Sequence, residues 1–157
     1  MAIEKGQTAP AFTLFDSEKN KVSLVDFKGK NVVLLFFPLA FTSVCTAELC
    51  SVRDNIAAYN NANAQVLGIS VDSLFTLGKF KAEQQLNFPV LSDFNKTASK
   101  DYGVLYDVFP AFDMQGVSKR AAFVIDSNST VQYAEICPTP GDQPSFEKIM
   151  ETLGSLS

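Results

Sequence analysis

The fold is indicated most clearly by residues 31–50, which read NVVLLFFPLAFTSVCTAELC. Positions 31–37 form an almost uninterrupted apolar run that Pro38 ends, and such a run is typical of a central strand buried on both faces of a sheet. From about Thr42 to Tyr59 the apolar spacing becomes helical. A buried strand that leads directly into an amphipathic helix indicates an α/β fold, in which ligands gather at the carboxyl ends of the strands.

The rest of the chain extends the same pattern. Alternating apolar residues on both sides of residues 17–20 predict an N-terminal β-hairpin. The other predicted elements are strands at 65–71, 88–91, 120–126 and 130–135, and helices at 73–86 (capped by Asp72 or Ser73), at 96–102 and from Pro144 onward. The order βββαβαβαββα predicts one α/β domain over residues 1–157, a mixed central sheet with helices on both faces.

Composition excludes several classes of protein. The chain has 157 residues, of which 46% are hydrophobic and 19% charged, so it is expected to fold rather than to remain disordered. Thirteen basic and seventeen acidic residues give a net charge of -4, which is not the footprint of a protein that binds nucleic acid or an anionic membrane. The start MAIEKGQTAP has no apolar signal core, and no apolar run approaches membrane-spanning length. We therefore expect a reducing, cytoplasmic location.

The chain contains no histidine, which excludes Ser-His-Asp and Cys-His couples, HExxH zinc sites and histidine-ligated haem. Its three cysteines, Cys45, Cys50 and Cys137, are too few for a four-cysteine zinc site and odd in number for a disulfide scaffold. No metal or cofactor is therefore predicted. The closely spaced pair of cysteines suggests redox chemistry instead, with a nucleophile activated by a helix terminus, an arginine, a lysine or backbone groups.

Cys45 is the candidate nucleophile. If Thr42 is the N-cap of the predicted helix, Cys45 occupies the third helical position, and the Thr42 hydroxyl reaches toward the backbone and sulfur of Cys45. Unpaired N–H groups and the positive end of the helix dipole favour the thiolate form of a cysteine in the first turn. The alternative is a buried apolar cysteine that continues the stripe of Leu49, Val52 and Ile56, as free cysteines commonly do.

Two arginines could complete the site. Arg53 lies more than two helical turns beyond Cys45 and is expected at the surface or paired with a nearby acid. Arg120, at the start of a predicted strand, could reach the thiolate from a neighbouring sheet position. Glu48, one turn after Cys45, could orient this guanidinium through a bidentate pair. The alternative for Arg120 is a surface salt bridge.

The pattern Pro38-x-x-x-Thr42-x-x-Cys45, with Arg120 far downstream, resembles the peroxiredoxin signature of the alkyl hydroperoxide reductase and thiol-specific antioxidant family. The resemblance covers nearly the whole chain, and residues 36–42 look most like the alkyl hydroperoxide reductase E branch. It implies an elaborated thioredoxin fold and a thiol peroxidase acting on hydrogen peroxide and organic hydroperoxides. In such an enzyme the Cys45 thiolate attacks the peroxide and becomes a sulfenic acid.

The resemblance also implies roles for the neighbouring residues. The Thr42 hydroxyl, the backbone N–H groups of Val44 and Cys45, and the Arg120 guanidinium would stabilise the charge that builds on the peroxide oxygens. Pro38 would shield the site from water. Phe109 and Phe112, in a proline-containing loop before Arg120, are explained by packing alone or by a role as pocket wall or homodimer contact, since the family is commonly dimeric through such loops.

Cys50 is the candidate resolving residue. In an intact helix the Cα atoms of Cys45 and Cys50 would be about 8.7 Å apart, and a disulfide needs less than about 7 Å, so a bridge requires the first helical turns to unwind. This CxxxxC spacing resembles peroxiredoxins of the bacterioferritin-comigratory type, which unwind in this way, whereas the E-branch similarity implies a one-cysteine enzyme resolved by an external thiol. We predict that Cys50 attacks the sulfenic acid and that a thioredoxin-like partner reduces the resulting disulfide.

The sequence allows alternative interpretations of Cys137 and of the function. Cys137 follows a predicted strand, is expected to be semi-exposed, and could resolve Cys45, pair across an oligomer or be a passive thiol, the reading we favour. A thioredoxin-like thiol–disulfide oxidoreductase is the alternative enzyme, although its usual Cys-x-x-Cys spacing is absent from this chain. A redox-sensing or chaperone-like binding protein is the non-enzymatic alternative.

Overall fold

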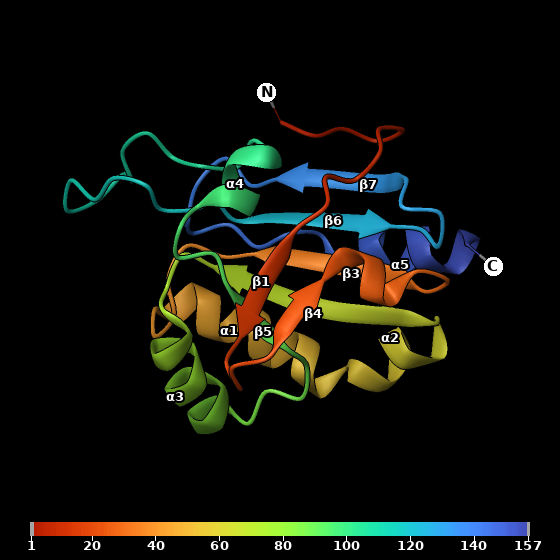
Figure 1. Cartoon of the computed structure of the whole chain (residues 1–157), viewed down its shortest axis with the longest axis horizontal. Coiled ribbons are helices and arrows are strands. Elements are labelled where there is room, and N and C mark those ends of the chain that lie inside the picture. The colour runs from red at the N-terminus through yellow and green to blue at the C-terminus, as the bar shows by residue number, and fades with distance from the viewer. Residues whose placement is uncertain (1, 157) are drawn as a thin grey trace.

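Seven strands form one mixed sheet in the computed structural model, which describes residues 2–156 (Figure 1). The strands are β1 (Thr13–Asp16), β2 (Lys21–Ser23), β3 (Asn31–Phe36), β4 (Ala64–Ser70), β5 (Val90–Ser92), β6 (Ala121–Ile125) and β7 (Val131–Ile136). The helices are α1 (Ser43–Asp54), α2 (Ile56–Asn61), α3 (Leu74–Gln84), α4 (Thr97–Asp101) and α5 (Phe146–Ser155), with a 3₁₀ helix, η1, at Leu24–Phe27. The strand order β2-β1-β5-β4-β3-β6-β7 confirms the predicted mixed sheet and N-terminal hairpin.

Strand β3 lies near the middle of the sheet and is buried at every position. It runs parallel to β4 and antiparallel to β6, and its last residue, Phe36, pairs with Ile69 on one side and Ala121 on the other. The apolar run at 31–37 predicts this placement because only a strand covered on both faces buries consecutive side chains. The pairing of Phe36 with Ala121 puts Arg120 beside the point where the chain leaves the sheet for α1.

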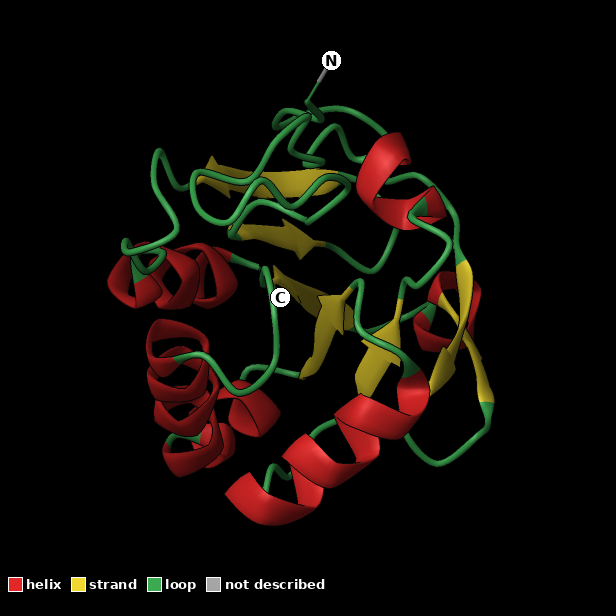
Figure 2. Ribbon diagram, turned by 90° about the vertical axis from the view of Figure 1, so that its left-hand side faces the viewer, coloured by secondary structure: helices red, strands yellow, loops and turns green. Residues whose placement is uncertain are grey.

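The helices cover the two faces of the sheet unequally. Val33 and Leu35 of β3 pack into a core with α1, α2, α3 and α5. On the other face, Val32 and Leu34 pack with α4, η1 and the segment before β1. In Figure 2 the strands lie between these helices. Within the described residues, no helix is long and apolar enough to cross a membrane.

Several helix boundaries differ from the predicted ones; α3, for example, ends at Gln84 and not at residue 86. The helix expected over 42–59 is interrupted at Asn55, whose side-chain amide donates to the carbonyl of Ser51 at 2.9 Å and so competes with regular helical hydrogen bonding. The last helix begins at Phe146 rather than at Pro144, because the Ser145 hydroxyl accepts from a backbone N–H of the first turn and acts as the N-cap. Helix α3 is capped by Ser73, one of the two predicted candidates.

Candidate active site

Cys45 and Arg120 meet at the edge of the sheet where β3 ends. Nη2 of Arg120 donates a hydrogen bond to Sγ of Cys45 at 3.2 Å. Cys45 has no exposed surface and Arg120 only 2%. A surface salt bridge, the alternative considered for Arg120, is thereby excluded. Arg53, by contrast, lies toward the surface and pairs with Asp54 at 3.0 Å, as expected.

The guanidinium of Arg120 is held by two further groups. Nη1 donates to Oε1 of Glu48 at 2.7 Å, and Nη2 also donates to the backbone carbonyl of Pro140 at 2.8 Å. The expectation of a bidentate pair with Glu48 is wrong. Nη2 of Arg120 donates to Cys45 and Pro140, so only Nη1 donates to Glu48. Oε2 of Glu48 and Nε of Arg120 are buried without a partner among residues 2–156.

The pKa values of both members of this ion pair are shifted, for different reasons. Burial raises the pKa of Glu48 to about 7, although the charge of Arg120 and its hydrogen bond act to lower it. Burial would lower the pKa of Arg120, but the charges of Cys45 and Glu48 and the hydrogen bonds to them raise it above its ordinary value. The guanidinium is therefore a permanent cation in contact with the sulfur.

Thr42 occupies the N-cap position of α1, which makes Cys45 the third residue of the helix, as predicted. The Thr42 side chain differs from the expectation. Its hydroxyl donates to the carbonyl of Leu39 at 2.8 Å and makes no capping bond. The turn before it contains Phe41 in the left-handed region, at φ 67°, which folds the Leu39 carbonyl back toward the helix start. The first-turn N–H groups beside Cys45 thus have no side-chain cap within the described chain.

A cavity of about 280 Å³ opens above Cys45. Pro38, Thr42, Cys45 and Arg120 all line it, so the structure brings together the four residues of the sequence pattern. Phe109 and Phe112 line it too, and they come from the loop between α4 and β6 that projects at the left of Figure 1. This arrangement agrees with the pocket-wall reading of the two aromatics.

Sequence reasoning missed several residues at this cavity. These residues are Leu39, Ser43, Met114, Pro140 and Gly141, whereas Val44, which also lines the cavity, was expected there through its backbone N–H. The Pro-Thr-Pro-Gly run at 138–141 is a turn signal, but nothing in it indicates that the turn folds back onto Arg120. That contact depends on the antiparallel pairing of β6 with β7, which returns the chain to the same edge of the sheet.

The other two cysteines lie in different surroundings. Helix α1 is continuous from Ser43 to Asp54, so Cys45 and Cys50 share an intact helix and cannot be bridged without unwinding it. Cys50 is partly exposed, and its Sγ donates to Oε1 of Gln84 at 3.5 Å. Cys137 is buried rather than semi-exposed, with 2% of its surface accessible. Burial and then the charges of Glu135 and Glu48 raise its pKa to about 11.

No group of three or more His, Cys, Asp or Glu side chains within residues 2–156 is placed to hold a metal ion. The groups present at this edge of the sheet are a buried sulfur, one guanidinium, helical N–H groups without a side-chain cap and a small, largely apolar cavity.

Comparison with known proteins gives consistent matches. The sequence pattern of the AhpC/TSA family matches residues 5–134. The chain is 38% identical over 131 residues to a putative chloroplastic peroxiredoxin Q of Oryza sativa subsp. indica, covering 83% of this chain but only 58% of that protein. It is 37% identical over 143 residues to alkyl hydroperoxide reductase E of Mycobacterium bovis, covering 89% of both.

Solved structures agree with these matches. Peroxidoxin BcpB of Mycobacterium tuberculosis superposes with a TM-score of 0.87 at 27% identity, over 99% of both chains. The reduced 2-Cys peroxiredoxin of Plasmodium vivax gives a TM-score of 0.86 at 32% identity, over 98% of this chain and 81% of that one. The α/β architecture derived from the sequence is thus shared with these proteins.

Proposed function

The chain belongs to the AhpC/TSA family of peroxiredoxins, and from this premise we propose that it is a thiol-dependent peroxidase with Cys45 as its peroxide-reacting residue. The observation that carries the proposal is the 3.2 Å contact between Arg120 and Sγ of Cys45 at the start of a helix. A guanidinium cannot lose its proton near neutral pH, so it favours an anionic sulfur without a histidine. Hydrogen peroxide and small organic hydroperoxides are the proposed substrates.

The first step is a substitution at oxygen. The Cys45 thiolate attacks the terminal oxygen of the hydroperoxide, an S–O bond forms and the O–O bond breaks. The sulfur is oxidised to a sulfenic acid, and the leaving oxygen takes up a proton to give water or an alcohol. Negative charge builds on the leaving oxygen as the bond breaks. Fixed donors that face this charge lower the barrier, and each typically contributes about 3–4 kcal/mol.

The donors are Arg120 and the N–H groups of the first turn of α1 at Val44 and Cys45. Thr42 has a different proposed role from the one that the sequence suggests. Its hydroxyl proton is engaged by Leu39, so the oxygen offers lone pairs to the cavity and can accept a hydrogen bond from the peroxide O–H. Such a bond would direct the terminal oxygen toward the sulfur.

Water must be kept away from this charge transfer. Pro38 is buried, has no N–H donor and lines the cavity, which suits it to exclude solvent. Phe109 and Met114 line the cavity from the projecting loop. A drier site strengthens the attraction between Arg120 and the developing oxyanion, since less solvent screens it.

We propose that Cys50 resolves the sulfenic acid. Its thiol attacks the Cys45 sulfur, the S–O bond breaks with release of water, and a disulfide remains for a thioredoxin-like or small-thiol reductant to reduce. The partial exposure of Cys50 supports this choice. Cys137 is a poor alternative because burial raises its pKa to about 11, which leaves little thiolate at neutral pH. Resolution by an external thiol is the competing route.

A homodimer is also proposed. Phe112, which lines the Cys45 cavity from the projecting loop, is 88% exposed, and Phe41, next to Thr42 in the chain, is 48% exposed. Large exposed aromatic residues beside a site are common at protein interfaces. Light scattering tests this proposal: the wild-type protein should have the mass of a dimer, and Phe112→Ser should shift it toward the monomer. A wild-type mass equal to that of a monomer would contradict the proposal.

The function is tested by the consumption of hydrogen peroxide in the presence of dithiothreitol or a thioredoxin system. Cys45→Ser should abolish turnover, whereas Cys137→Ser, the matched control at a buried cysteine, should retain it. Turnover by Cys45→Ser would overturn the proposal. Reduction of insulin disulfides without peroxide consumption would favour the thioredoxin-like alternative instead.

A further inference from the structure

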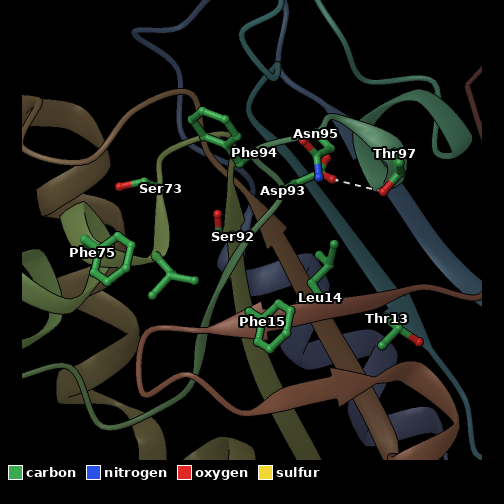
Figure 3. A pocket seen from close by; sticks show the side chains of 11 residues that line it. Thr13, Leu14, Phe15, Ser73, Phe75, Ser92, Asp93, Phe94, Asn95 and Thr97 are labelled. Carbon is green, nitrogen blue, oxygen red and sulfur yellow. Dashed lines mark hydrogen bonds between the residues drawn. The ribbon is translucent and has the colours of Figure 1, made fainter.

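A second cavity lies apart from Cys45. It has a volume of about 570 Å³ and forms where β1, the start of α3 and the segment after β5 come together. It shares no lining residue with the Cys45 cavity. Figure 3 shows the rings of Phe15, Phe75 and Phe94 on different sides of this cavity, with Leu14 in its wall. We call it the aromatic pocket.

The surface that the aromatic pocket offers to a ligand is mainly hydrocarbon. Several of its polar side chains are engaged within the protein. The Ser73 hydroxyl caps α3, and the Ser92 hydroxyl donates to the carbonyl of Asp72 at 2.6 Å. The buried carboxylate of Asp93 accepts from two backbone N–H groups at the start of α4, at 2.7 and 3.1 Å. The apolar side chains of the lining are Leu14, Leu74 and the three phenyl rings, and its other polar side chains are Thr13, Asn95 and Thr97.

Three lysines lie over the aromatic rings of the pocket. The exposed fractions of Phe15, Phe75 and Phe94 are 45%, 71% and 61%, unusual for three phenylalanines around one cavity. Each ring has an ammonium group above it: Lys21 over Phe15 at 5.9 Å, Lys19 over Phe75 at 5.9 Å and Lys96 over Phe94 at 5.6 Å. Within residues 2–156, none of these lysines has a carboxylate within 4.0 Å. In a chain of net charge -4, three lysines without a carboxylate partner thus lie over rings that line one apolar cavity, and the Lys96 ammonium also donates to the carbonyl of Phe94 at 3.1 Å.

We propose that the aromatic pocket binds a small amphipathic anion, an alkyl carboxylate of the fatty-acid type. Burial of its chain against Leu14, Leu74 and the phenyl rings removes apolar surface from water. The carboxylate would pair with one of the ammonium groups of Lys19, Lys21 and Lys96, and the other two would add to the positive potential around it. The volume lies within the range of about 300–1,000 Å³ typical of small-molecule pockets, and a concave cavity suits a chain better than a flat protein partner. The proposal is independent of the peroxidase chemistry at Cys45.

Titration calorimetry with decanoate, kept below its critical micelle concentration, tests the proposal. We expect saturable binding at one site. The triple variant Lys19→Glu/Lys21→Glu/Lys96→Glu should weaken it about tenfold or more, because charge reversal turns attraction into repulsion. The matched control is Lys5→Glu/Lys28→Glu/Lys30→Glu, which makes the same change in net charge at exposed lysines that lie over none of the three rings and should leave decanoate binding intact.

Two further measurements separate the pocket from general hydrophobic binding. Decanol should bind more weakly than decanoate because it lacks the charge. In ¹H–¹⁵N spectra, decanoate should shift the amide signals of Phe15, Phe75 and Phe94 rather than those around Cys45. Phe75→Ser changes an exposed residue and provides a second test that does not depend on charge; it should also weaken binding.

The proposal is wrong if decanoate does not bind, if both triple variants weaken binding equally, or if decanol binds as tightly as decanoate. Amide shifts confined to the Cys45 cavity would also overturn it. If decanoate does not bind but the triple variant at the pocket slows reduction by a thioredoxin-like protein, this surface docks a protein and not an amphiphile.

Discussion

Nη2 of Arg120 donates both to Sγ of Cys45, at 3.2 Å, and to the carbonyl of Pro140, at 2.8 Å, while Nη1 is held by Glu48. One planar group therefore links the sulfur, the turn after β7 and a buried acid. A guanidinium can do this because its donors point in fixed directions within one plane. A lysine ammonium, as a point charge on a flexible stem, cannot reproduce the arrangement.

Arg120→Lys should therefore slow the oxidation of Cys45 by hydrogen peroxide about 100-fold or more, the loss expected for one fixed donor to a developing oxyanion. Stopped-flow measurement of the reduced protein gives this rate directly. Arg53→Lys, at the partly exposed arginine, is the matched control and should react like the wild type. Equal rates for Arg120→Lys and the wild type would remove Arg120 from the proposed mechanism.

Two variants of Thr42 separate the effect of its hydroxyl group from that of its side-chain shape. Thr42→Val keeps the branched side chain but removes the oxygen proposed to accept from the peroxide, so the oxidation rate should fall by about two orders of magnitude. Thr42→Ser keeps the hydroxyl and should retain most of the rate. Loss of the bond to Leu39 should also lower the free energy of unfolding of the valine variant by about 1 kcal/mol. If the serine variant is as slow as the valine variant, the hydroxyl is not the functional group.

Glu48 makes the stability of the protein depend on pH. Its pKa is raised by burial to about 7 in the folded protein, from its ordinary 4.5. The folded state thus binds the proton more tightly than the unfolded state. The resulting stabilisation is complete below about pH 4.5 and is lost as the pH rises through 7.

Urea denaturation at pH 5 and pH 8 measures this effect. The free energy of unfolding should fall between these values by an amount on the order of 3 kcal/mol from this group. Glu48→Gln carries no titrating proton, so its stability should change much less over the same range. Parallel pH profiles for the two proteins would contradict the assignment.

The proposed role of Cys50 predicts which products form when the protein is oxidised by hydrogen peroxide. After one equivalent of hydrogen peroxide, mass spectrometry of the wild type should find a Cys45–Cys50 disulfide. Cys50→Ser should stop at the sulfenic acid, which dimedone traps at Cys45. Cys137→Ser is the control and should form the same disulfide as the wild type. A Cys45 sulfinic acid with no Cys45–Cys50 bond in the wild type would exclude Cys50 as the resolving residue.

Local sequence patterns predict most of the fold. The apolar run at 31–37 indicates the buried position of β3, and the capping position of Thr42 places Cys45 in the first turn of α1. These features depend on neighbours within a few residues, so spacing and propensity are sufficient to find them. The interruption at Asn55 is less visible, because asparagine is tolerated both inside helices and at their ends.

The candidate site is only partly predictable, because most of its contacts join residues that are far apart in the sequence. Contact between Arg120 and Cys45 could be expected from the residue types and the family resemblance, although 75 positions separate them. The single bond to Glu48 and the bond from Thr42 to Leu39 depend on tertiary geometry. The Pro140 carbonyl is least predictable, because a backbone acceptor carries no signal in the residue type.

The sulfur of Cys45 belongs to the same core as Leu49, Phe80 and Ile149. On the proposed cycle, each turnover that carries Cys45 out of α1 also loosens the packing that keeps the domain folded. We therefore expect thermal stability and turnover rate to oppose one another in this protein. Substitutions that tighten the core around Leu49 should raise the melting temperature and delay the recycling of the oxidised enzyme.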